Sequence, residues 1–247
     1  KDTLIVGMGA DAKSLDPHAT NDQPSSRVTK QIYETLINQN EKMELEPGLA
    51  LSWEPIDELT FEFKLKEGVT FHNGEVFTAN DVAFTLKRAL ESSHIGHIVG
   101  AIDAEKIEVV DDYTIRIATK EPFAPLLAHL AHTATGILNE KAVTEGGEDY
   151  GQKPVGTGPF KFANWVTGDR VELDRNDDYH GEKAKVAHVV FRNISDNTTR
   201  TIELESGGVD IAYDVQPTDV NRVEENDDLI LLRDMNLSTT YIGFNVM

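Results

Sequence analysis

The feature that most constrains the fold is a strand, a capped helix and a second strand in direct succession. The apolar run AHVVFRNI (187–194) precedes SDNTTRTIELESGG, a helix that Ser195 or Asp196 can cap, and VDIAYDV (209–215) follows it. Two strands joined through a helix usually lie parallel in one sheet, with the helix on its face. The succession therefore predicts an α/β fold with an at least partly parallel sheet.

Alternation of apolar and polar residues predicts further strands. A short buried strand is expected at 3–9 (TLIVGMG), and a half-buried one contains Phe61 and Phe63. The segment KIEVVDDYTIRIAT (106–119) reads as a hairpin. LILLRD and TTYIGFNV, near the end of the sequence, predict two more strands.

Helical spacing of apolar residues predicts helices between these strands. Ser25 or Ser26 is expected to cap the first helix, and Thr78 with Asp81 forms a variant capping box before NDVAFTLKRALE. PFAPLLAHLAH (122–132) also has helical spacing, and PTDVNRVEEN predicts a short helix.

The stretch PVGTGPFKF (154–162) resembles a phosphate-binding loop but lacks its requirements. A P-loop needs GxxxxGK[ST], and a dinucleotide loop needs GxGxxG at the start of a helix. Here Pro159 follows the second glycine, Lys161 stands where the third would be, and the residues beyond alternate as in a strand. We therefore expect a structural glycine turn that leads into a β-hairpin, and no phosphate site.

Composition excludes several classes of function. The 43 acidic and 23 basic residues give a formal charge of −20, which disfavours nucleic acid and anionic membranes as partners. The absence of cysteine excludes disulfides, thiolate metal sites and cysteine nucleophiles, and fits an extracytoplasmic protein. The first residues, KDTLIVGMGA, lack the parts of a signal peptide, so we expect any export signal to have been removed.

No catalytic motif of the HExxH, GxSxG or SxxK type occurs. The pairs His94/His97 and His129/His132 have the i,i+3 spacing of metal ligands, but no carboxylate lies at a matching offset. The prediction is a protein that is not an enzyme and that has no metal and no cofactor. The alternative is a metal- or carboxylate-dependent hydrolase that uses His94, His97 or nearby carboxylates.

The loop after the first strand is the first candidate for binding. Open α/β sheets bind ligands at the carboxyl ends of their strands, and this loop is rich in small hydrogen-bonding side chains. Two further candidates are SSHIGHIVG (92–100) and Tyr241 in the terminal strand, a position equally compatible with a core residue. The candidates in the first loop are Thr20, Asn21, Asp22 and Gln23.

Several segments occur together, in the same order, in one protein family. SLDPHATND, LEPGLALSWE, TFEFKLKEGVTFHNGEVFTANDVAFTLKRAL, PVGTGPFKFANW and ELESGGVDIAYDV closely resemble the family 5 extracellular solute-binding proteins, the dipeptide, oligopeptide, glutathione and nickel receptors of ABC importers. The resemblance covers essentially the whole chain. It implies a type II periplasmic-binding-protein-like lobe, with a mixed β-sheet flanked by helices and a smaller inserted α+β subdomain.

The resemblance also implies an organisation and a function. Family members are about twice as long, so this chain resembles their amino-terminal half, without the second lobe. The first-lobe core is expected at 1–33 and 154–247, and the inserted subdomain at 34–153. The implied function is capture of a peptide-like solute in a cleft between two lobes and delivery to a membrane permease, outside the cytoplasm, either in the periplasm or lipid-anchored. A nickel, metal-chelate or sugar receptor of the same fold is the alternative.

Site residues carry over from the family in the same way. In relatives the loop after the DPH motif contacts the ligand, which here implies Thr20 to Gln23. A loop of the inserted subdomain reaches the cleft near Ile95 and His97, and the HTATG segment does so near Thr135. Tyr241 is expected to line the cleft. Because the charged anchors of relatives lie mainly in the second lobe, we expect weak or no binding by this chain alone, and self-association through its exposed cleft face.

Overall fold

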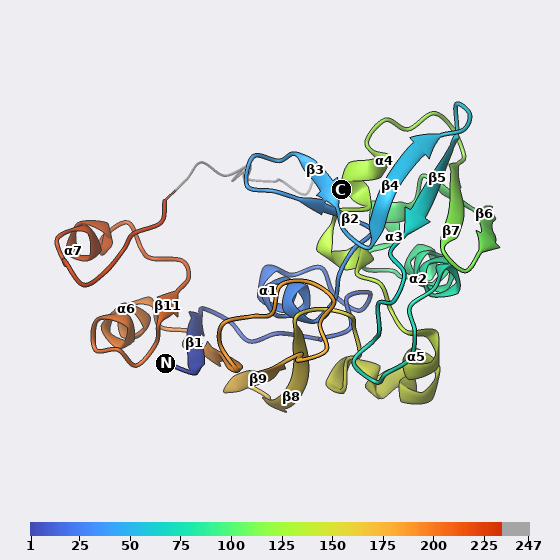
Figure 1. Ribbon diagram of the computed structural model, residues 1–247. Coiled ribbons are helices and arrows are strands. Elements are labelled where there is room, and N and C mark those ends of the chain that lie inside the picture. The colour runs from blue at the N-terminus through green and yellow to red at the C-terminus, as the bar shows by residue number, and fades with distance from the viewer. Residues whose placement is uncertain (234–247) are drawn as a thin grey trace, which may run out of the picture.

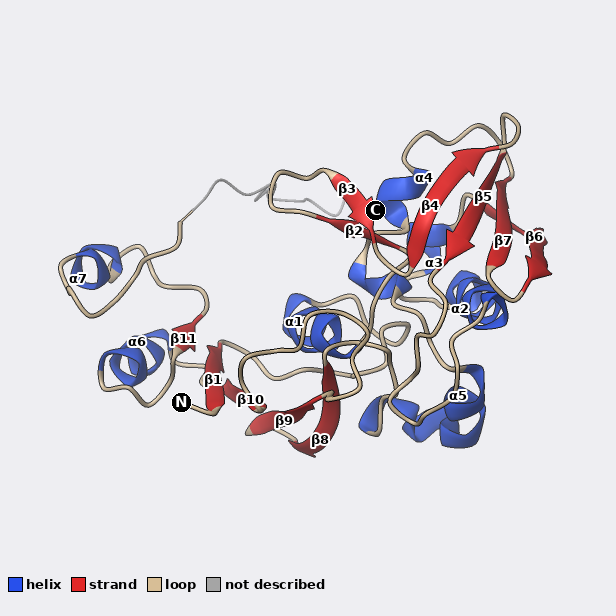
Figure 2. Ribbon diagram, viewed as in Figure 1, coloured by secondary structure: helices blue, strands red, loops and turns tan. Residues whose placement is uncertain are grey.

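The computed structural model describes residues 1–233, which form two bodies, each with its own sheet and apolar core (Figure 1). Figure 2 shows the strands as two separate groups, with α1 above the first group and α2 beneath the second. Among these residues, no helix is both long enough and apolar enough to cross a bilayer. We call the two units the first body, which contains the start of the chain, and the second body.

The first body is built on the mixed sheet that the sequence predicts. Strand β1 runs parallel to both of its neighbours, whereas the other strand pairs are antiparallel. Helix α6 (Asn197–Glu205) joins β10 to β11 as the predicted crossover, and its N-cap is Asp196, whose side chain accepts from the N–H of Thr199. The strand order is β11 (Ile211–Ala212), β1 (Thr3–Met8), β10 (His188–Asn193), β9 (Arg170–Arg175) and β8 (Phe160–Val166).

Helix α1 (Gln23–Ile32) packs Val28 and Ile32 into the core of the first body. Its N-cap is Asp22, so the prediction of Ser25 or Ser26 is wrong. The helix starts earlier because Pro24 lies in its first turn, where a backbone N–H is not needed for the helix.

The second body contains an antiparallel sheet and the helix predicted from NDVAFTLKRALE. Helix α2 (Ala79–Glu91) buries Val82 and Leu86 against the sheet, and the Thr78–Asp81 capping box is confirmed. The strand order is β4 (Ala50–Pro55), β5 (Thr60–Leu65), β7 (Thr114–Thr119) and β6 (Ile102–Asp111). The smaller elements are β2 (Ile37–Gln39), β3 (Leu45–Pro47), α3 (Gly96–Val99), α4 (Leu126–His129) and η1 (Thr133–Thr135).

The two cores meet between adjacent residues. Ile137 packs in the core of the second body, whereas Leu138 packs in that of the first, together with Val143 and Tyr150. These last residues precede residue 154, so the segment just before it contributes to the first core. The elements of that segment are α5 (Glu140–Gly146) and η2 (Gly147–Gln152). The division into 1–33 with 154–247, and 34–153, stays a prediction.

Three segments differ from their predicted structure. In 122–132 only Leu126–His129 is α-helical. Pro125 is the N-cap of this helix, and it has no backbone N–H with which a longer helix could continue through it. The described part of LILLRD forms no strand, and Ile230 is 85% exposed. The strand predicted at 209–215 is reduced to Ile211–Ala212, and it is followed by the helix α7 (Val220–Glu224). The predicted strand TTYIGFNV, with Tyr241, lies outside the described residues.

The glycine turn at 156–158 is structural, as expected. A Cβ on Gly156 would lie 2.1 Å from the carbonyl oxygen of Ile32, so only glycine fits. The N–H of Gly158 donates to the same oxygen at 2.8 Å. His72 lies beside the turn: its Nδ1 accepts from the N–H of Gly156 (3.3 Å), and its Nε2 lies 2.9 Å from the carbonyl oxygen of Gly158. The turn thus fixes α1 against β8.

Candidate functional site

The loop between β1 and α1 crosses the edge of the sheet where β1 ends. Asp22 caps the helix at the end of this loop: its Oδ1 accepts from the N–H of Ser25 at 3.0 Å, and the Thr20 hydroxyl donates to its Oδ2. Burial opposes ionisation, but the hydrogen bonds from Thr20 and Ser25 hold the pKa of Asp22 below its usual value. The carboxylate is therefore used within the loop, while the side chains of Asn21 and Gln23 are exposed on either side of it.

The backbone of the same loop offers polar groups to a partner. Among residues 1–233, the N–H groups of Thr20, Asn21 and Asp22 donate to no other backbone group. Asp22 itself is extended, with φ −90° and ψ 152°. An extended segment with unused backbone donors can pair with the main chain of an extended peptide, as an added strand does.

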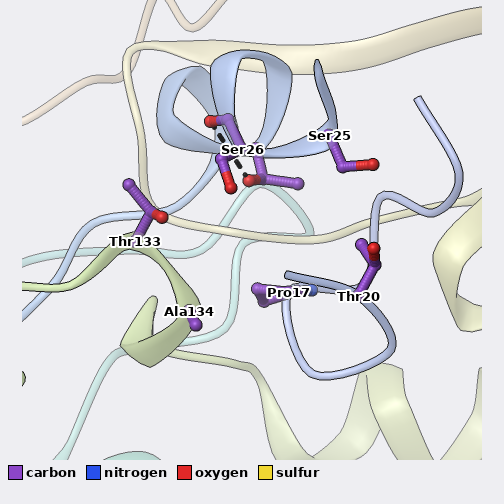
Figure 3. Close-up of a pocket in the computed structure, with 7 residues that line it drawn as sticks. Pro17, Thr20, Ser25, Ser26, Thr133 and Ala134 are labelled. Carbon is purple, nitrogen blue, oxygen red and sulfur yellow. Dashed lines mark hydrogen bonds between the residues drawn. The ribbon is translucent and has the colours of Figure 1, made fainter. Parts of the chain in front are cut away.

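The loop meets the second body at η1 (Figure 3). A cavity of about 10 Å³ separates them, which is room for about one water molecule. A solute must therefore lie over this contact and not inside it. The residues around the cavity, mostly small and hydroxyl-bearing, are Pro17, Thr20, Ser25, Ser26, Thr29, Thr133 and Ala134.

Two predicted contact residues are turned inward. Ile95 is fully buried in the core of the second body, since it is the apolar residue of an otherwise polar loop. Thr135 is also buried, and its hydroxyl bonds the carbonyl oxygens of Leu130 (3.1 Å) and His132 (2.8 Å). In this structure a contact from either residue to a solute would have to come from its backbone. His97, by contrast, is exposed on α3.

The histidines near this face have packing and capping partners. The ring of His129 packs edge-on against Phe123, with 5.0 Å between centroids. His132 Nδ1 accepts from the N–H of Ala134 at 3.1 Å, and burial, followed by the nearby His129 and His97, lowers the pKa of His132. Within residues 1–233, no group of three or more His, Asp or Glu side chains is arranged to hold a metal ion.

A larger polar hollow, of about 610 Å³, opens on the other side of η1 and shares Thr133 with the small cavity. Glu34 shapes one wall, because its two oxygens bond the Tyr179 hydroxyl (3.0 Å) and His180 Nε2 (2.8 Å). Sequence reasoning missed this hollow. Its wall comes from α1, the β2–β3 hairpin, η1 and residue 179, segments that only the folded chain brings together. Further lining residues are Lys30, Asn38, Gln39 and Glu46.

These features define a class of protein. The face lies at the carboxyl end of a sheet strand, joins two bodies, and presents amides, hydroxyls and backbone donors to solvent. Such groups fix the orientation of a bound molecule by hydrogen bonds. A face of this kind is suited to binding a small polar molecule.

Comparison with known proteins identifies the family. Residues 44–247 match the bacterial extracellular solute-binding proteins, family 5 Middle. The chain is 34% identical over 247 residues to the glutathione-binding protein GsiB of Pectobacterium atrosepticum, which covers 98% of this chain and 48% of that protein. The chain thus belongs to the family 5 solute-binding proteins, and spans about half the length of the curated relatives it matches.

Solved structures show the same relationship. The periplasmic binding protein DppA of Helicobacter pylori, in complex with peptide STSA, matches with a TM-score of 0.82 and 32% identity over 91% of this chain and 49% of that one. The binding protein AgaA of A. tumefaciens R10, in complex with agropinic acid, matches with a TM-score of 0.85 and 28% identity over 91% of this chain and 46% of that one. The predicted family and fold class are therefore confirmed.

Proposed function

We propose that this chain forms one lobe of the substrate-binding component of an ABC-type importer, which captures a peptide-like solute between two lobes and delivers it to a membrane permease. The observation that carries the proposal is the loop at Thr20–Asp22, which is extended at Asp22 and whose backbone N–H groups donate to no other backbone group among residues 1–233. This loop lies where the two bodies meet, next to a hydroxyl-rich surface.

This face fits a peptide-like solute that is bound through its amide groups better than a solute that must be bound through a charged side chain of the loop. The Asp22 carboxylate accepts the hydrogen bond that caps α1, and the exposed side chains beside it, Asn21 and Gln23, are neutral amides. Pairing through the main chain gives affinity with little preference for side chains. The ligands of two relatives support this proposal. GsiB is named for binding glutathione and DppA was solved with a peptide, and both ligands contain amide bonds. Thr20, Asn21, Asp22, Gln23 and His97 are the proposed first-lobe contacts, with Tyr241 a further one.

The partners and the location follow from the same proposal. The family is described as extracellular, so we place the protein outside the cytoplasm, either in the periplasm or lipid-anchored on the outer face of the membrane. Its partners are the solute and an ABC permease. Closure of two lobes on the solute would shift the protein to the form that docks on the permease.

Calorimetry on the parent protein, with both lobes, tests the proposal. The peptide STSA and reduced glutathione are the probes, and STSA N-methylated along its backbone is the control. We expect at least one probe to bind, and N-methylation to weaken the binding of STSA strongly, because the methyl groups keep the peptide main chain from lying against the N–H groups of the loop and remove hydrogens that would pair with a protein strand. Binding of a nickel chelate alone, or equal binding of the methylated peptide, would contradict the proposal.

A further inference from the structure

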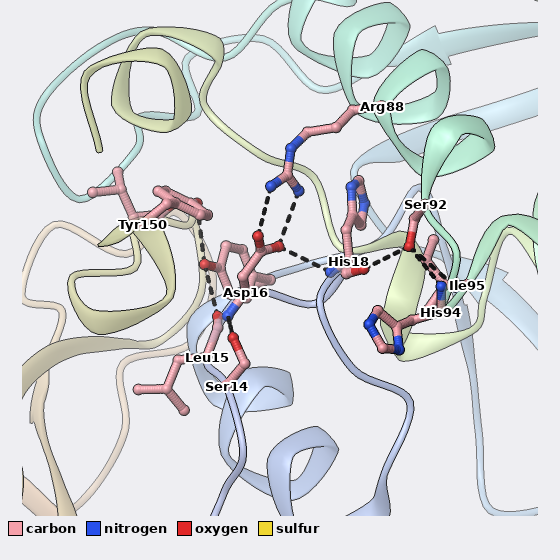
Figure 4. Close-up of polar contacts among 11 residues, drawn as sticks. Ser14, Leu15, Asp16, His18, Arg88, Ser92, His94, Ile95 and Tyr150 are labelled. Atoms are coloured by element: carbon pink, nitrogen blue, oxygen red, sulfur yellow. Dashed lines mark hydrogen bonds and ion pairs between the residues drawn. The ribbon is translucent and has the colours of Figure 1, made fainter. Parts of the chain in front are cut away.

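Ser92, the C-cap of α2, joins two loops that belong to different bodies (Figure 4). Its hydroxyl donates to the carbonyl oxygen of His18 at 2.6 Å. The same oxygen atom of Ser92 accepts from the N–H groups of His94 (3.1 Å) and Ile95 (3.2 Å). One side chain therefore connects the loop that leads to Thr20–Gln23 with the loop that leads to His97.

A second link lies one helical turn earlier on α2. The Arg88 guanidinium contacts Asp16 through two parallel bonds, Nη2 to Oδ2 at 2.6 Å and Nη1 to Oδ1 at 3.0 Å. Asp16 is buried, and its Oδ1 also accepts from the N–H of His18 at 2.9 Å. Both ends of the Asp16–His18 segment are thus held from the second body.

The surroundings favour a rigid connection. His18 is 4% exposed, so the segment it belongs to cannot move without disturbing the packing. Burial, and then the charge of Arg88, lower the pKa of His18 to about 4, so the ring is neutral at pH 7 and does not compete with Arg88 for Asp16. Tyr33 holds the other side of the segment, with its hydroxyl oxygen 3.1 Å from the carbonyl oxygen of Leu15.

We propose that Ser92 and Arg88 are positioning residues that couple the Thr20–Gln23 loop to the His94–His97 loop, so that the two act as one preformed surface for the solute. Two loops that are already ordered lose less conformational entropy when a ligand binds, and the affinity is higher for that reason. The purpose of the surface rests on the proposed function, whereas the coupling of the two loops does not.

Hydrogen exchange on the 1–247 chain without ligand tests the coupling. Ser92→Ala removes the shared hydroxyl, and Ser206→Ala is the matched control, because Ser206 is the C-cap of α6 and its hydroxyl bonds only Glu203 of its own helix. We expect Ser92→Ala to speed exchange several-fold in both 18–23 and 93–97, with the effect in 18–23 at His18 and Ala19, whose N–H groups donate to Asp16, and Ser206→Ala to change neither. Faster exchange in 93–97 alone would show a local cap, and no change in either segment would likewise overturn the coupling.

Arg88→Gln extends this test from the other link. It is expected to speed exchange in 93–97 as well as in 16–23, although among residues 1–233 the guanidinium of Arg88 hydrogen-bonds only to Asp16. Arg116→Gln is its control, since Arg116 also bridges carboxylates, those of Glu62 and Glu108, on the outer surface of the second body. Loss of protection in 16–23 only would contradict the proposal.

Affinity for STSA in the parent protein gives a second, separate readout. We expect Ser92→Ala to weaken binding about fivefold, as the loss of one hydrogen bond would. Ser92→Thr, which keeps the hydroxyl, should restore most of this loss, and Ser206→Ala should not alter affinity. If wild-type protein does not bind STSA, the proposed function fails for that probe, while the exchange data still decide whether the loops are coupled. Unchanged affinity in Ser92→Ala, with wild-type binding, would remove the role in solute binding.

Discussion

At the scale of single residues, His18 is buried and His72 is half-buried, and both imidazoles are held in the neutral form. Burial is the main cause that lowers the pKa of each to about 4, against 6.5 in an unfolded chain. His72 also uses Nδ1 as an acceptor for the N–H of Gly156, which a protonated ring could not do. The unfolded chain therefore binds more protons than the folded one between pH 6.5 and 4.

The first prediction is that the free energy of unfolding falls as the pH falls from about 6.5 to about 4, and that the contribution of these two histidines to the fall ends below about 4. Each histidine contributes about 3 kcal/mol over this range. Urea denaturation at several pH values measures it. His72→Gln should reduce the slope by about one proton over this range. A slope that His72→Gln does not alter would contradict this origin.

The second prediction concerns the glycine turn. Gly156→Ala should destabilise the protein by about 3 kcal/mol or more, because the new methyl group would collide with the Ile32 carbonyl and separate α1 from the turn. Gly74→Ala is the control: Gly74 has a φ of +85° but open space around it, so only backbone strain remains, at a cost of about 1 kcal/mol. Midpoints of thermal unfolding compare the two. Equal losses would show that the close approach does not matter.

At the scale of elements, Arg200 of α6 holds the carboxyl ends of two strands. It is buried, and its nitrogens donate to the carbonyl oxygens of Ile194 (2.6 Å) after β10 and of Tyr213 (2.8 Å) and Asp214 (3.2 Å) after β11. These groups are backbone acceptors, and the guanidinium reaches all three from one position. One side chain therefore holds the segment after β11 to the end of β10, in addition to the backbone bonds that pair β11 with β1.

The third prediction is that Arg200→Lys destabilises the protein by about 3 kcal/mol, even though the charge is kept, because one ammonium group cannot replace a planar guanidinium at separate acceptors. Arg116→Lys, on the exposed face of the second body, should destabilise the protein much less, because solvent screens its ion pairs. Denaturant unfolding provides the comparison. A loss below 1 kcal/mol for Arg200→Lys would mean that water replaces the missing donors.

Local sequence signals predicted the elements that depend on local chemistry. The hairpins, the Thr78–Asp81 capping box and the Asp196 cap are confirmed, because each is decided by neighbours in sequence. The predicted start of α1 is too late in the sequence, because Ser25 and Ser26 are also good N-cap residues and Asp22 is the one that caps the helix. LILLRD has no clear alternation of apolar and polar residues, and its described part pairs with no described strand. Strand pairing depends on the fold, and a sequence pattern alone does not supply it.

At the scale of the whole molecule, the sequence predicts the proposed binding face only in part. The Thr20–Gln23 loop stays a prediction, which rests on its place after a strand and on a family motif. The inward turn of Ile95 and Thr135, and the hollow beside Glu34, could not be predicted, since they depend on how two bodies pack. The Ser92 link carries no sequence signal, because a serine at a helix end ordinarily serves its own helix.

The fourth prediction is that the 1–247 chain self-associates. Ile230 and Leu232 are 85% and 90% exposed beside a hollow of about 1060 Å³, and β11 is an edge strand. Exposed apolar side chains next to a strand edge favour association. Light scattering at increasing concentration measures the mass. Ile230→Lys with Leu232→Lys should shift it toward the monomer, whereas Val109→Lys with Val110→Lys, on β6, should not. A monomer at every concentration would contradict the prediction.

The passage between the bodies has one more consequence. The chain leaves the first core after Tyr33 and returns at Leu138, and at this point the N–H of Ile137 donates to the carbonyl oxygen of Glu34 at 2.8 Å. The outgoing and returning segments of the chain thus touch, so both covalent connections to the second body leave the first body at one point. A different domain could replace the second body, in evolution or by grafting, without a break in the sheet of the first body. On the proposed coupling, the new domain would need a residue equivalent to Ser92 to hold the Thr20–Gln23 loop in place.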